Sequence, residues 1–278
     1  MTAQASPTAA TPVARRRPAR WRPSSALLAI VLGFIALQVV AFAAERLSGS
    51  HRDDLNAGTA IALVAGDLAL IAIVIAFARR GAERLSAATF GVRRTAFGPA
   101  LGWMLVVYFG VGALETLWIA VLGHGVRHAG TSSPHVHGVA AALGLVFAIA
   151  VVAPIAEELS FRGYLFGALT RWRGPWIAAV LTGLLFGAAH FLVYPLAFLP
   201  ALAVFGFGAC LLFWFTGSLL PSIALHSLNN AIATAVLLGW GWQAPVAIVG
   251  AVATALALLA PFARERAPQT VQQGGTAA

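Results

Sequence analysis

The chain has 278 residues, of which 60% are hydrophobic and 10% are charged, and its mean hydropathy is +0.85. This composition excludes a soluble globular domain and indicates a polytopic membrane protein. The net charge of +9 comes from arginine alone; such an excess in a membrane protein reflects topology and lipid headgroups, so no nucleic-acid partner is expected.

Apolar windows of about 20 residues, the length that crosses a bilayer, follow one another along the chain. They predict an all-α polytopic membrane protein, a bundle of about eight transmembrane helices, with spans at 24–44, 57–78, 99–122, 139–170, 175–193, 196–216, 219–238 and 244–262. The sequence shows no internal repeat, so a transporter built from inverted repeats is not indicated.

Composition along the chain divides it into four regions. We expect a disordered basic N-terminal tail at 1–23, three N-terminal transmembrane helices within 24–138, a transmembrane core with polar motifs at 139–262 and a disordered C-terminal tail at 263–278. Residues 41–43 have the small-x-small form of a signal-peptide cleavage site. The apolar stretch before them is longer than the usual signal peptide, so a retained helix is expected.

Arginines gather in alternate loops and in both tails. If the N-terminus is cytoplasmic, fourteen arginines lie on the cytoplasmic side, within 15–22, 79–94, 171–173 and 264–266, and three lie on the other side, at 46, 52 and 127. Because cytoplasmic loops are enriched in positive residues, both termini are expected in the cytoplasm. The protein is expected in the cell (inner or plasma) membrane, with the lipid bilayer as its surroundings.

The fourth window carries charged residues at membrane depth. It is too long for one perpendicular crossing and contains Pro154 and the pair Glu157-Glu158, so a kinked or interrupted helix is predicted. Glu158 and Arg162 are four residues apart and can form an ion pair on one helix face. One arginine cannot compensate two buried carboxylates, which leaves Glu157 as a candidate general base, although a purely structural ion pair is also possible.

Two later helices carry histidines and an amide. His190 follows Phe186 by one helical turn, and His226 shares a face of its helix with Asn230. Each could be a satisfied core residue or part of an inter-helix hydrogen bond. Yet these two polar groups and the Glu157-Glu158-Arg162 group all lie on the C-terminal helices, while other spans stay apolar. They predict one shared polar chamber. The Gly163/Gly167 and Gly183/Gly187 pairs, both GxxxG, would let these helices approach closely.

These three motifs, Glu157-Glu158-x-x-x-Arg162, Phe186-x-x-x-His190 and His226-x-x-x-Asn230, resemble the signature of the CPBP family of intramembrane endopeptidases, also called the ABI or CAAX-protease family. The family includes CAAX prenyl endopeptidases and bacterial proteins linked to bacteriocin processing and self-immunity. The resemblance covers about 139–240 and implies that the core at 139–262 is catalytic.

The resemblance also implies roles for the motif residues. Glu157 would activate a water shared with His190 and return the proton to the leaving amine, and His226 and Asn230 would stabilise the oxyanion. Glu158 and Arg162 would support the site. The family is historically classed as metalloproteases, and zinc could bind Glu157, His190 and His226. The resemblance nevertheless implies a metal-free, glutamate-dependent site, so no cofactor is expected.

Other readings of the sequence remain open. The buried acids Asp67 and Glu115 lie outside the motifs and are compatible with a proton-coupled transporter, and a catalytically silent membrane scaffold is a further alternative. Histidines 124, 128, 135 and 137 form a loop cluster that a peripheral metal could use. The expected substrate is a membrane protein or peptide; the alanine-rich, lysine-free composition indicates a GC-rich bacterial genome, in which prenylated substrates are not expected.

Overall fold

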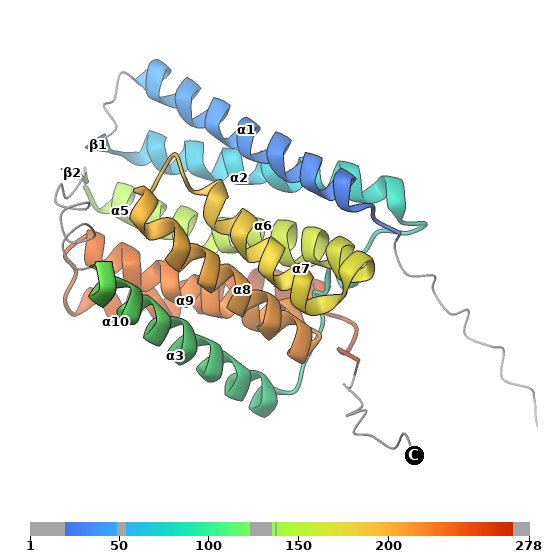
Figure 1. Ribbon diagram of the computed structural model, residues 1–278. Coiled ribbons are helices and arrows are strands. Elements are labelled where there is room, and N and C mark those ends of the chain that lie inside the picture. Colours follow the sequence, from blue (N-terminus) through green and yellow to red (C-terminus); the bar gives the residue numbers. More distant parts are fainter. Residues whose placement is uncertain (1–19, 49–53, 123–134, 137, 269–278) are drawn as a thin grey trace, which may run out of the picture.

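The computed structural model describes residues 20–48, 54–122, 135–136 and 138–268, and it is helical apart from two short strands (Figure 1). The α-helices are α1 (Pro23–Ser48), α2 (Ala57–Ala78), α3 (Phe97–Leu122), α5 (Gly138–Phe147), α6 (Ala153–Glu158), α7 (Gly167–Ala189), α8 (Leu199–Thr216), α9 (Leu219–Leu237) and α10 (Gln243–Leu259). Two π-helical segments, η3 (Ala148–Val152) and η4 (Leu159–Phe166), interrupt the chain between α5 and α7. Short 3-10 turns are η1 (Arg79–Gly81), η2 (Ala87–Phe90), η5 (Leu196–Phe198) and η6 (Ala260–Phe262), and the strands β1 (Asp54–Leu55) and β2 (His135–Val136) pair in parallel.

Within this described part of the chain, six helices are long and apolar enough to cross a membrane. An all-α membrane protein is therefore confirmed, but the count of about eight spans is not. One of the six is a continuous 52-residue stretch, 138–189, in which Gly174 has φ 77° and ψ 171° and kinks the helix between two predicted windows. Helix α9 is not among the six, because its histidine and two asparagines lower its hydropathy.

The helices that carry the motifs lie in the middle of the bundle. In Figure 1, α1 and α2 pack side by side along one flank, α3 lies along the opposite flank next to α8, and the segments from α5 to α9 lie between them. Close approach of α1 and α2 depends on small residues, since a Cβ at Gly33 would lie 2.3 Å from a side-chain carbon of Leu70. The outward faces of the flanking helices expose large apolar side chains, as lipid-facing surfaces do.

The predicted irregularity of the fourth span is confirmed, and proline explains its first part. In η3 the backbone N–H of Ala153 donates to the carbonyl of Ala148, five residues back. The carbonyl of Ile149 thereby loses its usual helical donor, and Pro154, the next residue along, has no N–H to offer. The Asn230 side chain of α9 satisfies this carbonyl, with Nδ2 donating to the Ile149 oxygen at 2.9 Å.

Glycines bring α7 and α8 into backbone contact, as the second GxxxG pair predicts. A Cβ at Gly183 would lie 2.6 Å from the carbonyl oxygen of Ala203, and one at Gly187 would lie 2.6 Å from that of Leu199. The first pair has different neighbours: Gly163 lies against the backbone of Phe90 in η2, outside the membrane-spanning helices. Only the pair in α7 therefore joins two spanning helices along their backbones.

The ends of both predicted tails pack against the bundle. Residues 1–19 and 269–278 lie outside the described part. Within the rest, Trp21 is buried and its Nε1 donates to the Ala78 carbonyl at 2.9 Å. The segment 263–268 runs beside Arg94, whose N–H donates to the Glu265 carbonyl at 2.8 Å. Residues 20–23 and 263–268, which the sequence assigns to the tails, therefore contact the bundle through buried apolar groups and backbone hydrogen bonds. The described chain begins and ends at one end of the bundle (Figure 1).

Candidate active site

Five ionisable side chains from distant parts of the sequence meet inside the bundle. Glu157 and Glu158 end α6, Arg162 lies in η4, His190 follows the last residue of α7, and His226 lies in the middle of α9. The kink at 174 turns the chain back on itself, so that His190 returns to the level of Glu157. The predicted convergence of the carboxylate and both imidazoles is therefore confirmed.

Glu158 is the centre of a buried ion-pair network. Its Oε1 lies 2.9 Å from Arg162 Nη1 and 2.9 Å from His226 Nδ1. Arg162 also donates from Nη2 to the Gly206 carbonyl at 3.1 Å, and its guanidinium carbon lies 4.5 Å from the ring centroid of Phe186. The side chains of Glu158 and Arg162 have no exposed surface. A buried guanidinium requires a nearby anion, so this network holds Glu158 as a carboxylate.

Glu157 faces the two imidazoles without touching them. Its Oε2 lies 3.9 Å from His190 Nε2 and 3.8 Å from His226 Nε2. These separations are too long for direct hydrogen bonds. One water could bridge either pair, Glu157 with His190 or Glu157 with His226, by hydrogen bonds of about 2.8 Å to each atom of the pair. Oε2 is buried and has no hydrogen-bond partner among the described residues. The three atoms thus surround a place where a polar molecule would be bound.

Hydrogen bonds on the far side of each ring orient both histidines. His190 Nδ1 lies 2.8 Å from the Phe186 carbonyl oxygen, and His226 Nδ1 lies 2.9 Å from a Glu158 carboxylate oxygen. Both oxygens are acceptors, so each Nδ1 carries the proton and each Nε2 faces Glu157. The Phe186 ring packs against both imidazoles, with centroids 4.9 and 5.7 Å away, and covers the chamber as its position one turn before His190 predicts.

Asn230 is held by a hydrogen bond to a neighbouring segment, outside the cluster of Glu157, His190 and His226. It lies one turn beyond His226 in α9, but within the described residues no hydrogen bond joins it to Glu157 or to either histidine. One of its amide hydrogens goes to Ile149. The second hydrogen on Nδ2 has no partner in the described chain, so the amide both anchors α9 to η3 and keeps one free donor.

The comparison with protein families concerns this same region. Residues 139–232 match the family model described as "Rce1-like: Type II CAAX prenyl endopeptidase Rce1-like". This segment is therefore similar to Rce1-like domains. The match extends from α5 into α9 and contains all seven motif residues, so the resemblance identified from the motifs is confirmed. No curated protein and no solved structure matches the chain.

Two side chains next to the Rce1-like chamber have no place in the motifs. Asp67 of α2 is buried and interacts electrostatically with Glu157. Tyr194, in the loop after α7 and outside the candidate spans, has its ring centroid 5.9 Å from that of His190. Desolvation of its hydroxyl, reinforced by the charge on Glu157, raises the pKa of Tyr194 above its ordinary value. Asp67 could be found in the sequence as a lone acid in an apolar helix, whereas nothing singles out Tyr194.

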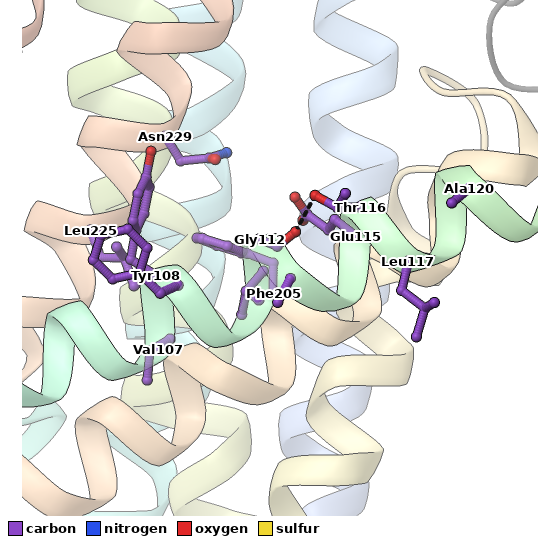
Figure 2. Close-up of a pocket in the computed structure, with 13 residues that line it drawn as sticks. Val107, Tyr108, Gly112, Glu115, Thr116, Leu117, Ala120, Phe205, Leu225 and Asn229 are labelled. Carbon is purple, nitrogen blue, oxygen red and sulfur yellow. Dashed lines mark hydrogen bonds between the residues drawn. The ribbon is translucent and has the colours of Figure 1, made fainter.

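Glu115, the other lone acid, lies on α3 beside a separate cavity of about 760 Å³. Glu115, Phe205 of α8 and Asn229 of α9 line this cavity (Figure 2). The Phe205 ring also packs against His226, with centroids 5.1 Å apart. One aromatic ring therefore separates the cavity beside Glu115 from the Rce1-like chamber.

Glu157, His190 and His226 are the candidate metal ligands of the chamber. In the described ranges, no group of three His, Cys, Asp or Glu side chains is arranged to hold a metal ion. Zinc ligands at about 2.0–2.1 Å from a tetrahedral ion lie roughly 3.3 Å apart, and the Glu157–imidazole separations of 3.8 and 3.9 Å are longer. The present spacing therefore does not fit zinc. Three members of the loop histidine cluster, at 124, 128 and 137, lie outside the described residues.

Proposed function

We propose that this protein is an intramembrane endopeptidase that hydrolyses a peptide bond of a membrane-associated protein or peptide. One observation carries the proposal: a buried carboxylate oxygen of Glu157 faces the Nε2 atoms of His190 and His226 at 3.9 and 3.8 Å, inside the Rce1-like domain. Hydrolysis of an amide needs an activated water, donors for the oxyanion and a proton for the leaving nitrogen. The chamber offers groups for each task.

Glu157 is the general base of this proposal. A water bound between Glu157 Oε2 and His190 Nε2 gives a proton to the carboxylate as its oxygen attacks the scissile carbonyl carbon. The protonated Glu157 then delivers the same proton to the leaving amine, and the C–N bond breaks. Burial supports this role, since bulk water does not compete with the bound water for proton transfer to a buried carboxylate.

His226 and Asn230 would stabilise the oxyanion. His226 lies between two carboxylates, Glu157 and Glu158, against which Arg162 supplies one positive charge. A proton on His226 Nε2 would make this atom a donor toward the reacting carbonyl, while Nδ1 stays bonded to Glu158. The free amide hydrogen of Asn230 would be a second donor. Support for His226 is its Nδ1 bond to Glu158; support for Asn230 is its position one turn away.

The reaction we propose uses no metal. The spacing of the three candidate ligands favours a bridging water over zinc. A chelator such as EDTA is therefore expected to leave activity unchanged. Loss of activity on chelation, restored by zinc, would contradict the metal-free reaction while leaving the endopeptidase itself in place.

The test of the function is a search for uncut substrates. Membranes from cells with the wild type or with Glu157→Gln are compared for protein termini, and precursors are expected to accumulate only in the variant. Glu115→Gln, which removes a lone acid outside the chamber, is the control and should behave as wild type. Equal termini in all samples would overturn the proposal. Proton-coupled uptake in proteoliposomes that depends on Asp67 or Glu115 would instead favour a transporter.

The chemistry of the substrate follows from the depth of the site. The chamber lies among apolar helices, so the scissile segment must enter from the membrane or be held at its surface. The family description refers to prenyl endopeptidases, and we propose that this chain acts on an unprenylated membrane peptide of a bacterial cell. A prenylated CAAX peptide that is cut faster than its unprenylated form would contradict this choice.

A further inference from the structure

We infer that a second polar site, at the end of the bundle where the chain begins and ends, binds the phosphate group of an anionic phospholipid. A cavity of about 790 Å³ lies there, between the start of α1, the end of α2 and the first turns of α7. Its lining has four arginines and one acid: Arg20, Arg22, Arg80, Arg171 and Glu83, with Trp21, Gly81 and Ala82. We call it the arginine pocket.

The walls of the arginine pocket are fixed by specific contacts. The N–H of Arg20 donates to the Gly81 carbonyl at 2.7 Å, which ties the start of the described chain to the end of α2. Next to it, the Trp21 ring packs against Tyr164 with centroids 4.8 Å apart. A Cβ at Gly81 would lie 2.8 Å from the Trp21 ring and 3.0 Å from the Arg20 carbonyl. The pocket is thus a built cavity whose shape depends on glycine at position 81.

Positive charge exceeds negative charge in the lining of the pocket, where Glu83 is one acid beside four arginines. In the described part of the chain, Arg20, Arg22, Arg80 and Arg171 form no ion pair with a carboxylate. Two of them contact aromatic faces: the guanidinium carbon of Arg171 lies 5.6 Å from the Trp21 ring centroid and that of Arg80 lies 4.5 Å from that of Phe77. Such contacts orient the guanidinium groups and leave their N–H donors available for an anion.

Two other arginines, Arg94 and Arg264, differ from those of the pocket in their hydrogen bonds. Arg94 and Arg264 donate from Nε to the carbonyls of Ala263 and Pro261, at 3.0 and 3.1 Å. These side chains help to fix the C-terminal segment, and no described cavity has them in its lining. The four arginines of the pocket, by contrast, line a concave surface and have no ion-pair partner in the described chain.

The depth of the pocket selects a lipid as the ligand. The apolar stretch of α1 begins at Pro23, directly after Arg22, and that of α2 ends at Gly81, so the pocket lies where the hydrocarbon layer gives way to headgroups. Arginine binds phosphate through paired N–H groups. The following turns of α1 expose Leu27 and Leu28, which would contact the acyl chains of a phospholipid whose phosphate occupies the pocket.

Lipid titration of the purified full-length protein tests this inference. Binding of phosphatidylglycerol and of zwitterionic phosphatidylcholine to the protein in detergent is measured by native mass spectrometry. Phosphatidylglycerol is expected to bind more tightly. The double variant Arg80→Gln/Arg171→Gln should weaken phosphatidylglycerol binding at least about tenfold, since each basic residue adds about a factor of five to anionic lipid binding.

Arg173→Gln is the matched control, because Arg173 has the same charge, lies two residues from Arg171 and packs on Trp172 outside the pocket. It should bind phosphatidylglycerol as the wild type does. Equal binding of both lipids, or equal losses in the double variant and the control, would overturn the inference. Inorganic phosphate that displaces the lipid at equal concentration would also overturn it, since the pocket would then select a free anion. Unchanged thermal unfolding of the variants shows that they remain folded.

Discussion

Two polar sites of the bundle differ in whether their arginines are paired with acids. In the chamber of the candidate active site, the Arg162 guanidinium is paired with Glu158, which also binds His226. In the arginine pocket, four guanidinium groups lie close together without a paired acid in the described chain. The difference follows from depth. A charge among apolar helices must be matched inside the protein, whereas a charge at headgroup level can be matched by the membrane itself.

Glu157→Gln gives the sharpest test of this comparison. Glutamine has the same shape, and Glu157 Oε2 has no hydrogen-bond partner among the described residues that the change would remove. We expect turnover of an identified substrate to fall by about 10²–10⁴, the usual contribution of a general base, while the thermal unfolding temperature stays close to that of the wild type. A large loss of stability with retained activity would show that Glu157 only serves the structure.

Arg162→Ala should break the balance inside the chamber. It leaves Glu158 buried with only His226 as its partner, and removal of one member of a buried pair costs about 3–5 kcal/mol. Unfolding in detergent measures this loss. The double variant Glu158→Gln/Arg162→Met is the control, because it removes both charges and is expected to recover most of the stability. If both variants were equally unstable, packing around Phe186 and not charge would explain the effect.

The sequence predicts parts of this chamber because they depend on local spacing. The Glu158–Arg162 pair follows from four residues of separation, and the meeting of Glu157 with His190 follows from their equal distances to the turn near 174. The bond from His226 to Glu158 could not be predicted, since it depends on how α9 is rotated against α6. The hydrogen bond from Asn230 to Ile149 could not be predicted either, because it depends on the π-helical turn of η3, which the sequence pattern does not specify.

Larger features show the same division. Eight apolar windows in the sequence compare with six long apolar helices in the described chain. The two differ at α9, which carries polar chamber residues, and at Gly174, where two windows lie within one assigned helix that is kinked there. Composition marks 1–23 and 263–278 as tails, yet the anchoring of Trp21 and Ala263 depends on distant partners. The arginine pocket was present in the sequence only as separate charges in separate loops.

Asn230→Ala should have a moderate effect on the fold. It removes the donor to the Ile149 carbonyl, which has no helical partner, and an unsatisfied buried carbonyl costs about 1–3 kcal/mol. Thermal unfolding should show this loss, together with a lower turnover if the second amide hydrogen serves the oxyanion. Asn229→Ala is the matched control, since Asn229 lines the cavity beside α3 and makes no such bond among the described residues. Equal losses would contradict the assignment.

Asp67→Asn distinguishes an endopeptidase from a transporter. Its expected effect on an endopeptidase is smaller than that of the preceding variants. Asp67 is buried and interacts electrostatically with Glu157, and neutral asparagine of similar shape puts no new charge beside Glu157. In the endopeptidase, activity should stay within about tenfold of the wild type and stability should change by no more than about 1 kcal/mol. Activity assays and unfolding in detergent check both. A complete loss of function at this residue would assign the essential proton to Asp67.

Tyr194→Phe should have the smallest effect, which is visible only in alkali. Since the folded protein raises the pKa of the Tyr194 hydroxyl, the unfolded chain releases this proton first, near pH 10. The folded state therefore binds more protons above that pH, and stability falls as pH rises through the folded pKa. Thermal unfolding at pH 8 and at about pH 10.5 should show a smaller alkaline loss for Tyr194→Phe than for the wild type. Tyr108→Phe on α3 is the control, and an equal response of both variants would place the effect outside the chamber.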